Sequence, residues 1–279
     1  MVRRFIERCK ARIQMNRKLF IVYSILRFFV ILTAVRCLFT RNYESFLFCI
    51  LSLLLFLVPT FFEEKLMIEI PTTLHIIIYL FIYAAEILGE VNKYYTAIPG
   101  WDTMLHTING FLCASIGFSL VQILNRGSKN LSLSPVYVAL MAFCFSMTVG
   151  VLWEFFEYSC DVFLYNDTQK DFIVQEISSV SLDPTHSQIP IHVKDITKTT
   201  IETKNGDVYV IDGGYLDIGI HDTMKDLIVN FIGAVVFSVF GYIYEKNAKS
   251  FASRLMIRTL SEEEIETQNK KNSRKTVFT

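Results

Sequence analysis

Long apolar runs separated by short polar connections dominate the hydrophobic pattern of this chain. About 20 predominantly apolar residues are needed to cross the hydrocarbon core of a bilayer as an α-helix. Six runs of about this length stand in the sequence, at about 19–39, 43–62, 72–90, 102–124, 135–161 and 221–244. The pattern therefore predicts an all-α, polytopic helical membrane protein with about six transmembrane helices.

The polar stretches divide the chain into five parts. Residues 1–18 form a basic segment with interspersed apolar side chains, which predicts a cytoplasmic amphipathic segment at the membrane surface. Residues 19–162 hold transmembrane helices 1–5, residues 163–221 form a polar insertion, and residues 222–244 hold transmembrane helix 6. The charged tail, residues 245–279, is expected to begin as a helix and to fray into a Lys/Asn-rich end.

The distribution of basic residues predicts the orientation in the membrane. Six spans place both termini on one side, together with the loop that carries Arg126 and Lys129. Loops rich in Lys and Arg stay on the cytoplasmic side. We therefore expect cytoplasmic termini, an extracytoplasmic insertion and a multi-pass location in the cell membrane.

The insertion carries a β-hairpin signal. Two runs rich in β-branched residues, 200–204 and 207–211, flank Asn205 and Gly206. An Asn-Gly pair between two such runs is typical of a two-residue type I′ turn. The sequence thus predicts one hairpin outside the membrane.

The composition is typical of a membrane protein and gives no sign of nucleic acid as a partner. Of the 279 residues, 52% are hydrophobic and 24 are Phe, which is more apolar material than a soluble domain normally buries. The formal net charge of +0 gives no general attraction to nucleic acid, so membrane lipid is the expected partner. The six cysteines lack the spacing of a disulfide framework or a structural zinc site. No P-loop, dinucleotide-binding, nucleophile-elbow or His-Glu-x-x-His motif is present.

Three carboxylates interrupt the fifth apolar run near its end. Glu154, Glu157 and Asp161 fall within roughly 60° of one another on a helix that turns about 100° per residue. A carboxylate in lipid costs at least a few kcal/mol unless it is paired or faces a polar interior. We therefore expect this stripe to face other polar groups.

Three other spans carry matching polar stripes. Their members are Glu86 and Glu90 in span three, Asp102 and His106 in span four, and Asp222, Asp226 and Asn230 in span six. In the predicted topology every stripe lies at the outer end of its span. The sequence therefore predicts one shared site in the outer leaflet.

Such a concentration of acids favours a bound cation. Neighbouring carboxylates raise one another's pKa, and a cation keeps several of them ionised. Carboxylates with one His suit Mg²⁺, Mn²⁺, Ca²⁺ or Zn²⁺. We expect Asp102, His106, Glu154, Asp222 and Asp226 as metal ligands, Glu157 and Glu154 as catalytic acid/base groups, and Glu86, Glu90, Asp161 and Asn230 in supporting positions.

Structural roles are the alternative for several of these residues. Asp102 and Asp222 stand where ordinary helix-capping acids would, and His106 has the pattern of a histidine that packs on an apolar face. Glu90 and Asp161 are close enough to the interface to be simply solvated. Asn230 has the position of a residue that bridges helices by hydrogen bonding.

The order of these pieces resembles the VanZ-like group of bacterial membrane proteins, and more closely an uncharacterised bacterial family of multi-pass membrane-spanning proteins. The similar segments are Asp102-Thr-Met-Leu-His106, Trp153-Glu-Phe-Phe-Glu157, and residues 222–233. The resemblance covers spans four to six and singles out His106, Glu154, Asp226, Asn230 and Gly233.

The chain also departs from the VanZ-like pattern. The second acidic helix of VanZ-like proteins usually pairs Glu with Gln and a later Arg, whereas Glu157 takes the Gln place here and the Arg is absent. The insertion before Asp222 is also longer. VanZ-like proteins are linked to glycopeptide-antibiotic resistance, so the resemblance implies a bacterial cell-envelope role and supplies no reaction.

Three functions fit these patterns. The first is a metal-dependent hydrolase or transferase that acts on a lipid or a lipid-linked envelope precursor at the outer leaflet. The second is a proton- or cation-coupled transporter whose acids relay charge. The third is a non-catalytic envelope accessory protein that binds its partner through the hairpin.

Overall fold

The computed structural model describes residues 16–66, 68–127, 133–247 and 255–259. The predicted segment 1–15, Lys129, and residues 248–254 and 260–279 of the tail lie outside the described residues. The chain divides into two compact units, one of residues 1–150 and 229–279 and one of residues 151–228.

The prediction of six membrane-spanning helices is confirmed. Within the described residues, six helices are long and apolar enough to cross a membrane: Arg17–Phe39, Tyr43–Glu63, Thr72–Val91, Trp101–Asn125, Pro135–Leu164 and Ile220–Lys246. The chain is thus a polytopic helical membrane protein with small antiparallel sheets.

The first unit begins with α2 (Arg17–Phe39), α3 (Tyr43–Leu55) and α4 (Val58–Leu66). The side chain of Asn16 accepts hydrogen bonds from the backbone of Lys18 and Leu19 and thereby caps α2. The second span, expected to be one helix, is interrupted after Leu55, where α3 ends and α4 begins three residues later. The sequence pattern alone did not reveal this interruption.

The third span combines two helix types. It begins as α5 (Thr72–Ile82) and continues as the π-helix η1 (Tyr83–Val91). The i→i+5 hydrogen bond from Asn92 N–H to the Ile87 carbonyl, 3.0 Å long, is characteristic of the wider turn. The predicted third span is therefore confirmed, and its π-helical part is a detail that hydrophobic periodicity does not resolve over a few residues.

The helices α2, α3, α5 and η1 share a buried cluster of apolar residues. At its centre the Tyr79 ring lies 5.5 Å from that of Tyr23 and 5.4 Å from that of Phe56, measured between centroids. The charged residues of the first span have polar neighbours, as expected for charges inside a membrane. Arg36 donates a hydrogen bond to Asn92 Oδ1 at 3.0 Å, and Arg27 donates one to the Tyr23 hydroxyl at 3.4 Å.

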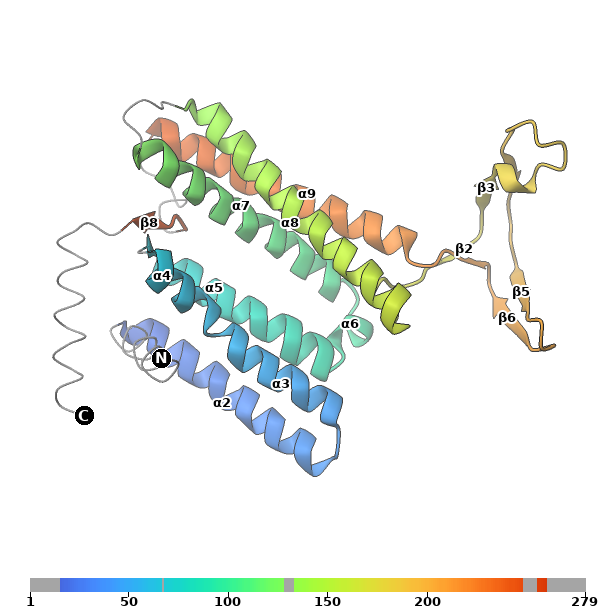
Figure 1. The fold of residues 1–279 in the computed structure, drawn as a ribbon, viewed down its shortest axis with the longest axis horizontal. Helices are drawn as coiled ribbons and strands as arrows, with labels where there is room; N and C mark the ends of the chain where they lie inside the picture. Colours follow the sequence, from blue (N-terminus) through green and yellow to red (C-terminus); the bar gives the residue numbers. More distant parts are fainter. Residues whose placement is uncertain (1–15, 67, 128–132, 248–254, 260–279) are drawn as a thin grey trace. The chain divides into compact units, whose positions relative to one another are not determined.

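The short α6 (Tyr94–Ala97) leads to α7 (Trp101–Gly127), which packs within the first unit against the adjoining parts of α8 (Pro135–Leu164) and α9 (Ile220–Asn247). Figure 1 shows these three helices in green, yellow-green and orange. Small residues allow close approach, as is usual between membrane helices. A Cβ at Gly110 would collide with the Asn230 carbonyl, and one at Gly233 would collide with the Thr107 carbonyl.

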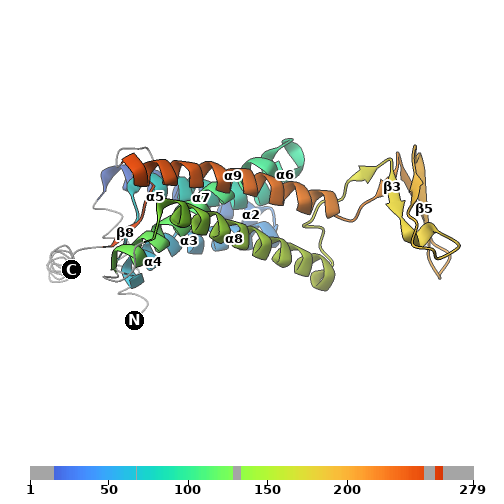
Figure 2. The same cartoon turned by 90° about the horizontal axis from the view of Figure 1, so that it is seen from above.

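The described part of the tail returns to the helices instead of continuing as one. Strand β8 (Arg258–Thr259) pairs antiparallel with β1 (Ile68–Glu69), next to the end of α4 (Figures 1 and 2). Leu255 is fully buried, its carbonyl accepts a hydrogen bond from Ser115 Oγ at 2.6 Å, and the Ile257 N–H donates one to Ser119 Oγ at 2.9 Å. The expected helix is therefore wrong for residues 255–259, because their apolar side chains are buried against α7.

The second unit contains the polar insertion, which extends from residue 165 to residue 219 between the helical residues of α8 and α9. Three antiparallel pairs form in it. Strand β2 (Ile173–Val174) pairs with β7 (Tyr215–Leu216), and β3 (Ile177–Ser179) pairs with β4 (Ile191–Val193). The short 3₁₀-helix η2 (Val180–Leu182) follows β3.

The predicted hairpin is confirmed, but its turn differs from the expected type. Strand β5 (Lys198–Glu202) pairs with β6 (Val208–Asp212), as Figure 1 shows. The Thr203 N–H bonds to the Asp207 carbonyl, and only Gly206 has a positive φ in the loop between these residues. A type I′ turn needs positive φ at both central residues, whereas a three-residue loop needs it only at its Gly.

Candidate functional site

Asp102 and His106 form a pair at the start of α7. They stand four residues apart on one helix face, and Asp102 Oδ1 lies 3.5 Å from His106 Nε2. The His106 side chain is 11% exposed and that of Asp102 is 28% exposed. Because α7 begins at Trp101, Asp102 is a first-turn acid, where the helix dipole favours negative charge. The first unit therefore brings one oxygen and one nitrogen donor together.

Asn230 joins three helices within the first unit. The residue is 1% exposed, its Oδ1 accepts a hydrogen bond from Asn109 Nδ2 at 3.3 Å, and its Nδ2 donates to the Ser146 carbonyl at 3.5 Å. Ser146 in turn donates to the Gly110 carbonyl at 2.7 Å. The alternative interpretation of Asn230 as a bridging residue is thus confirmed, and its role fixes the packing of α9 on α7 and α8.

The start of α9 carries two acids and a lysine, all in the second unit. Asp222 and Asp226 are 6% and 2% exposed. Lys225 Nζ lies 3.6 Å from Asp222 Oδ1 and 3.9 Å from Asp226 Oδ1. Asp222 Oδ2 also accepts a hydrogen bond from the backbone N–H of Lys170 at 2.8 Å. Lys225 therefore supplies positive charge that the sequence analysis had assigned to a metal ion alone.

The three carboxylates at the end of α8 have different surroundings. Glu154 is 5% exposed, whereas Glu157 is half-buried and accepts a hydrogen bond from Trp153 Nε1 at 2.9 Å. Asp161 accepts hydrogen bonds from the backbone of Thr168 at 2.6 Å and of Gln169 at 2.8 Å. Asp161 thus holds the loop that follows α8, a structural task that the sequence did not indicate.

Glu86 and Glu90 lie in the π-helix η1. Glu90 is exposed, in agreement with its interpretation as a solvated residue, and Glu86 is half-buried. One carboxylate oxygen of Glu86, Oε2, is buried and has no hydrogen-bond partner among the described residues. π-Helical turns are frequent at functional sites. The Oε2 atom of Glu86 could therefore accept a hydrogen bond or bind a proton within the first unit.

Asp217 organises the entry to α9. Its carboxylate accepts hydrogen bonds from the backbone of Phe172 at 2.7 Å, of Gly219 at 3.2 Å and of His221 at 2.8 Å. Burial raises the pKa of this carboxyl, but the three N–H donors outweigh burial and the resulting pKa is lowered. Asp217 was not among the residues predicted from the sequence, although an Asp two residues before a Gly and a helix start is a recognisable turn signal.

Four other residues that were not predicted from the sequence contact the candidate site residues. Asn109, Gly110 and Ser146 surround Asn230, and Lys225 faces two acids. Asn109 stands seven residues after Asp102 on the same helix face, so the stripe of span four could have been extended to include it. No local signal pointed to Ser146.

Within the described residues, six apolar helices define a polytopic membrane protein, and several of these helices carry acids, amides or a histidine near one end. Residues 20–247 match the model of a family described as predicted membrane protein (DUF2238), so the chain belongs to that family. An uncharacterised protein of Thermotoga maritima is 32% identical over 114 residues, which make up 40% of this chain and 57% of that relative. The chain therefore covers little more than half the length of this relative. No solved structure matches the chain.

Proposed function

We propose that this protein is a metal-dependent hydrolase or transferase that acts on a lipid or lipid-linked precursor at the outer surface of the membrane. The observation that supports it most directly is the Asp102–His106 pair, with Oδ1 and Nε2 3.5 Å apart inside the first turns of a membrane helix. An imidazole and a carboxylate so placed are typical ligands of a hard or borderline divalent cation. The resemblance of spans four to six to VanZ-like proteins supports a place in the bacterial cell envelope.

We assign Asp226 as the third ligand. Asp226 precedes Asn230 by one helical turn, and Asn230 packs on Gly110, which follows His106 by one turn. A carboxylate oxygen of Asp226 would add a third donor to those of Asp102 and His106, as the matching polar stripes of the sequence predict. Because both oxygens of Asp222 are engaged with Lys170 and Lys225, we give Asp222 a positioning role beside the ion.

The remaining residues receive roles in the chemistry. An ion held by these ligands supplies Lewis-acid activation of an ester or phosphoester. Glu157 is our candidate general base, since it is half-buried and the Trp153 Nε1–H group fixes its orientation. The buried Glu154 is the second acid/base candidate, one helical turn deeper. Lys225 balances the charge of Asp222 and Asp226 when the cation is absent.

A cation- or proton-coupled transporter is the second candidate. The buried Oε2 of Glu86 in a π-helical turn supports it, because protonatable groups in irregular membrane helices are common in ion pathways. The acids of α8 and α9 would then relay charge instead of holding a resident ion. The two candidates differ in whether a metal stays bound and whether a cation crosses the membrane.

Manganese binding to the purified, metal-depleted protein tests the proposal. We expect about one Mn²⁺ per chain, detected by loss of the electron paramagnetic resonance signal of free Mn²⁺. His106→Ala and Asp226→Asn should each weaken binding by at least about tenfold, the usual size of an effect at or near a metal ligand. Lys225→Gln should strengthen binding, since it removes a cation that competes for Asp226.

The matched control is Glu44→Gln, which removes an exposed acid from the first turn of α3. It should leave Mn²⁺ binding unchanged. Equal binding by His106→Ala and Glu44→Gln would disprove the ligand set. Lack of Mn²⁺ binding together with Asp226-dependent cation uptake into proteoliposomes would favour the transporter instead.

A further inference from the structure

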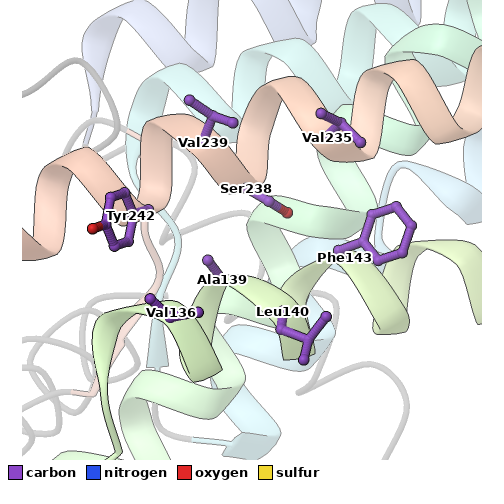
Figure 3. Close-up of a pocket in the computed structure, with 8 residues that line it drawn as sticks. All are labelled: Val136, Ala139, Leu140, Phe143, Val235, Ser238, Val239 and Tyr242. Carbon is purple, nitrogen blue, oxygen red and sulfur yellow. The ribbon is translucent and has the colours of Figure 1, made fainter.

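A groove lies between α8 and α9 in the first unit (Figure 3). Its volume is about 380 Å³, within the usual size range of ligand pockets. Four residues of α8 between Val136 and Phe143 and four residues of α9 between Val235 and Tyr242 line it. With one exception, Ser238, these are apolar or aromatic residues.

The position of the groove determines the chemistry of its occupant. Both helices are membrane spans, so the open side of the groove faces the hydrocarbon of the bilayer. Leu140 and Val239, on opposite walls, are 52% and 51% exposed. A flexible apolar chain fills a groove of this kind, as lipid acyl chains do.

The lining favours a lipid chain over a second protein helix. Membrane helices that pack on one another present small residues, which let the backbones approach. Ala139 and Ser238 are the small residues of this groove, but Leu140, Phe143 and Val239 also line it, and their larger side chains hold a helix backbone away. Where α7 does meet α9, the contact uses Gly110 and Gly233.

One buried polar group opens into the groove. Ser238 is 9% exposed, and its hydroxyl points from α9 into the space between the two helices (Figure 3). The hydroxyl oxygen has no hydrogen-bond partner among the described residues. The carbonyl oxygen of a lipid ester that reaches Ser238 would accept a hydrogen bond from this hydroxyl.

The end of the groove that is predicted to be cytoplasmic carries the groups expected at a lipid headgroup. Tyr242 lines the groove, and Lys246 Nζ lies 4.8 Å from the centre of its ring. Tyr is enriched at the membrane interface, and Lys near a helix end extends to the headgroups. Glu245 points about 100° away from Lys246 on the helix. Positive charge on this side attracts anionic lipids of the cytoplasmic leaflet.

We propose that the groove between α8 and α9 binds an anionic phospholipid of the cytoplasmic leaflet. One acyl chain lies along the groove between Leu140 and Val239, and the phosphate lies next to Lys246. The site is separate from the proposed metal ligands and does not depend on their function.

Native mass spectrometry of the full chain tests the site. The protein is stripped of lipid and titrated with dioleoylphosphatidylglycerol or dioleoylphosphatidylcholine. The unmodified protein should bind the anionic lipid more tightly. Ala139→Phe, which fills the groove, should weaken binding of both lipids by at least about tenfold. Lys246→Gln should retain binding but abolish the preference for the anionic lipid.

Two control variants separate the groove from general effects. Val236→Phe adds the same side chain to an exposed position of α9 outside the lining, and Lys93→Gln removes an exposed lysine outside the groove. Both should bind lipid as the unmodified protein does. Equal lipid binding by Ala139→Phe and Val236→Phe would overturn the proposal. A change in oligomeric state with Ala139→Phe alone would also overturn it, because the groove would then be an interface between two copies.

Discussion

Aspartates of this chain perform tasks that their residue type does not reveal. Asp161, Asp183 and Asp217 accept hydrogen bonds from nearby backbone N–H groups and hold loops of the second unit. Asp102 and Asp226 lie inside membrane helices next to a histidine and a lysine, respectively. The first group stabilises local structure, and we propose the second as cation ligands.

Acidification should weaken the structure around Asp217. Its pKa is lowered in the folded protein, so its contribution to stability is complete above the ordinary Asp pKa of about 3.9 and is lost as the pH falls through the folded pKa. Asp217→Asn should cost about 1–3 kcal/mol at pH 7, the usual value for hydrogen bonds to a charged group, and should remove this acid sensitivity. Amide hydrogen exchange of Phe172 and His221 between pH 7 and pH 3 measures both effects.

Asp212→Asn is the control, since it changes an exposed acid of the same unit. Its exchange rates should follow those of the unmodified protein. Identical acid sensitivity of Asp217→Asn and the unmodified protein would show that the three N–H donors do not depend on this carboxylate.

At the scale of elements, α7, α8 and α9 are held together by small residues around one buried amide. Gly110, Gly150 and Gly233 leave room for backbone contacts and for the Asn230 side chain. In lipid, packing and hydrogen bonds replace the hydrophobic effect as the force between helices. The position of α9, and with it that of Asp226, therefore depends on these glycines.

A larger side chain at Gly233 should separate α9 from α7. Gly233→Leu places atoms where the Thr107 carbonyl and the Phe111 N–H now lie, which should cost about 1–3 kcal/mol or more. The thermal unfolding midpoint of the protein in detergent measures this loss. Val236→Leu enlarges a side chain that is 42% exposed on the same helix and should leave the midpoint unchanged. Equal midpoints for the two variants would contradict the close contact.

At the scale of the whole molecule, the number of spans and the distribution of charge predict the topology. Six spans put the polar insertion on the opposite side from both termini. The described end of the tail is anchored through Leu255 and β8 in the first unit, next to the start of the third span. We therefore expect the insertion, with its three strand pairs, to be the extracytoplasmic part of the protein.

Cysteine labelling of intact cells checks this topology. In a chain whose six natural cysteines are replaced, a membrane-impermeant maleimide should label Asn205→Cys in the exposed hairpin loop. Ser134→Cys, in the connection before α8, should react only after the cells are made permeable. Both positions are exposed in the structure. The reverse pattern would invert the topology and would place the acid/histidine residues on the cytoplasmic side.

The sequence by itself determined the membrane class, the six spans and the hairpin. These features depend on local patterns: about 20 apolar residues must cross the hydrocarbon, and an Asn-Gly pair favours a tight turn. The sequence also identified the Asp102–His106 pair, because residues four apart share a helix face.

Only the tertiary structure decided which residues contact the predicted spans and their polar side chains. The π-helix, the return of Leu255 to α7 and the contacts of Asn230 with Asn109 and Ser146 depend on packing between distant segments. Lys225, by contrast, could have been found from the sequence, because residues three apart on a helix are neighbours and Lys225 follows Asp222 by three. Hydrophobic periodicity predicts which face of a helix is buried. The side chains that meet on that face depend on how closely the helices pack and on hydrogen bonds between residues far apart in the sequence.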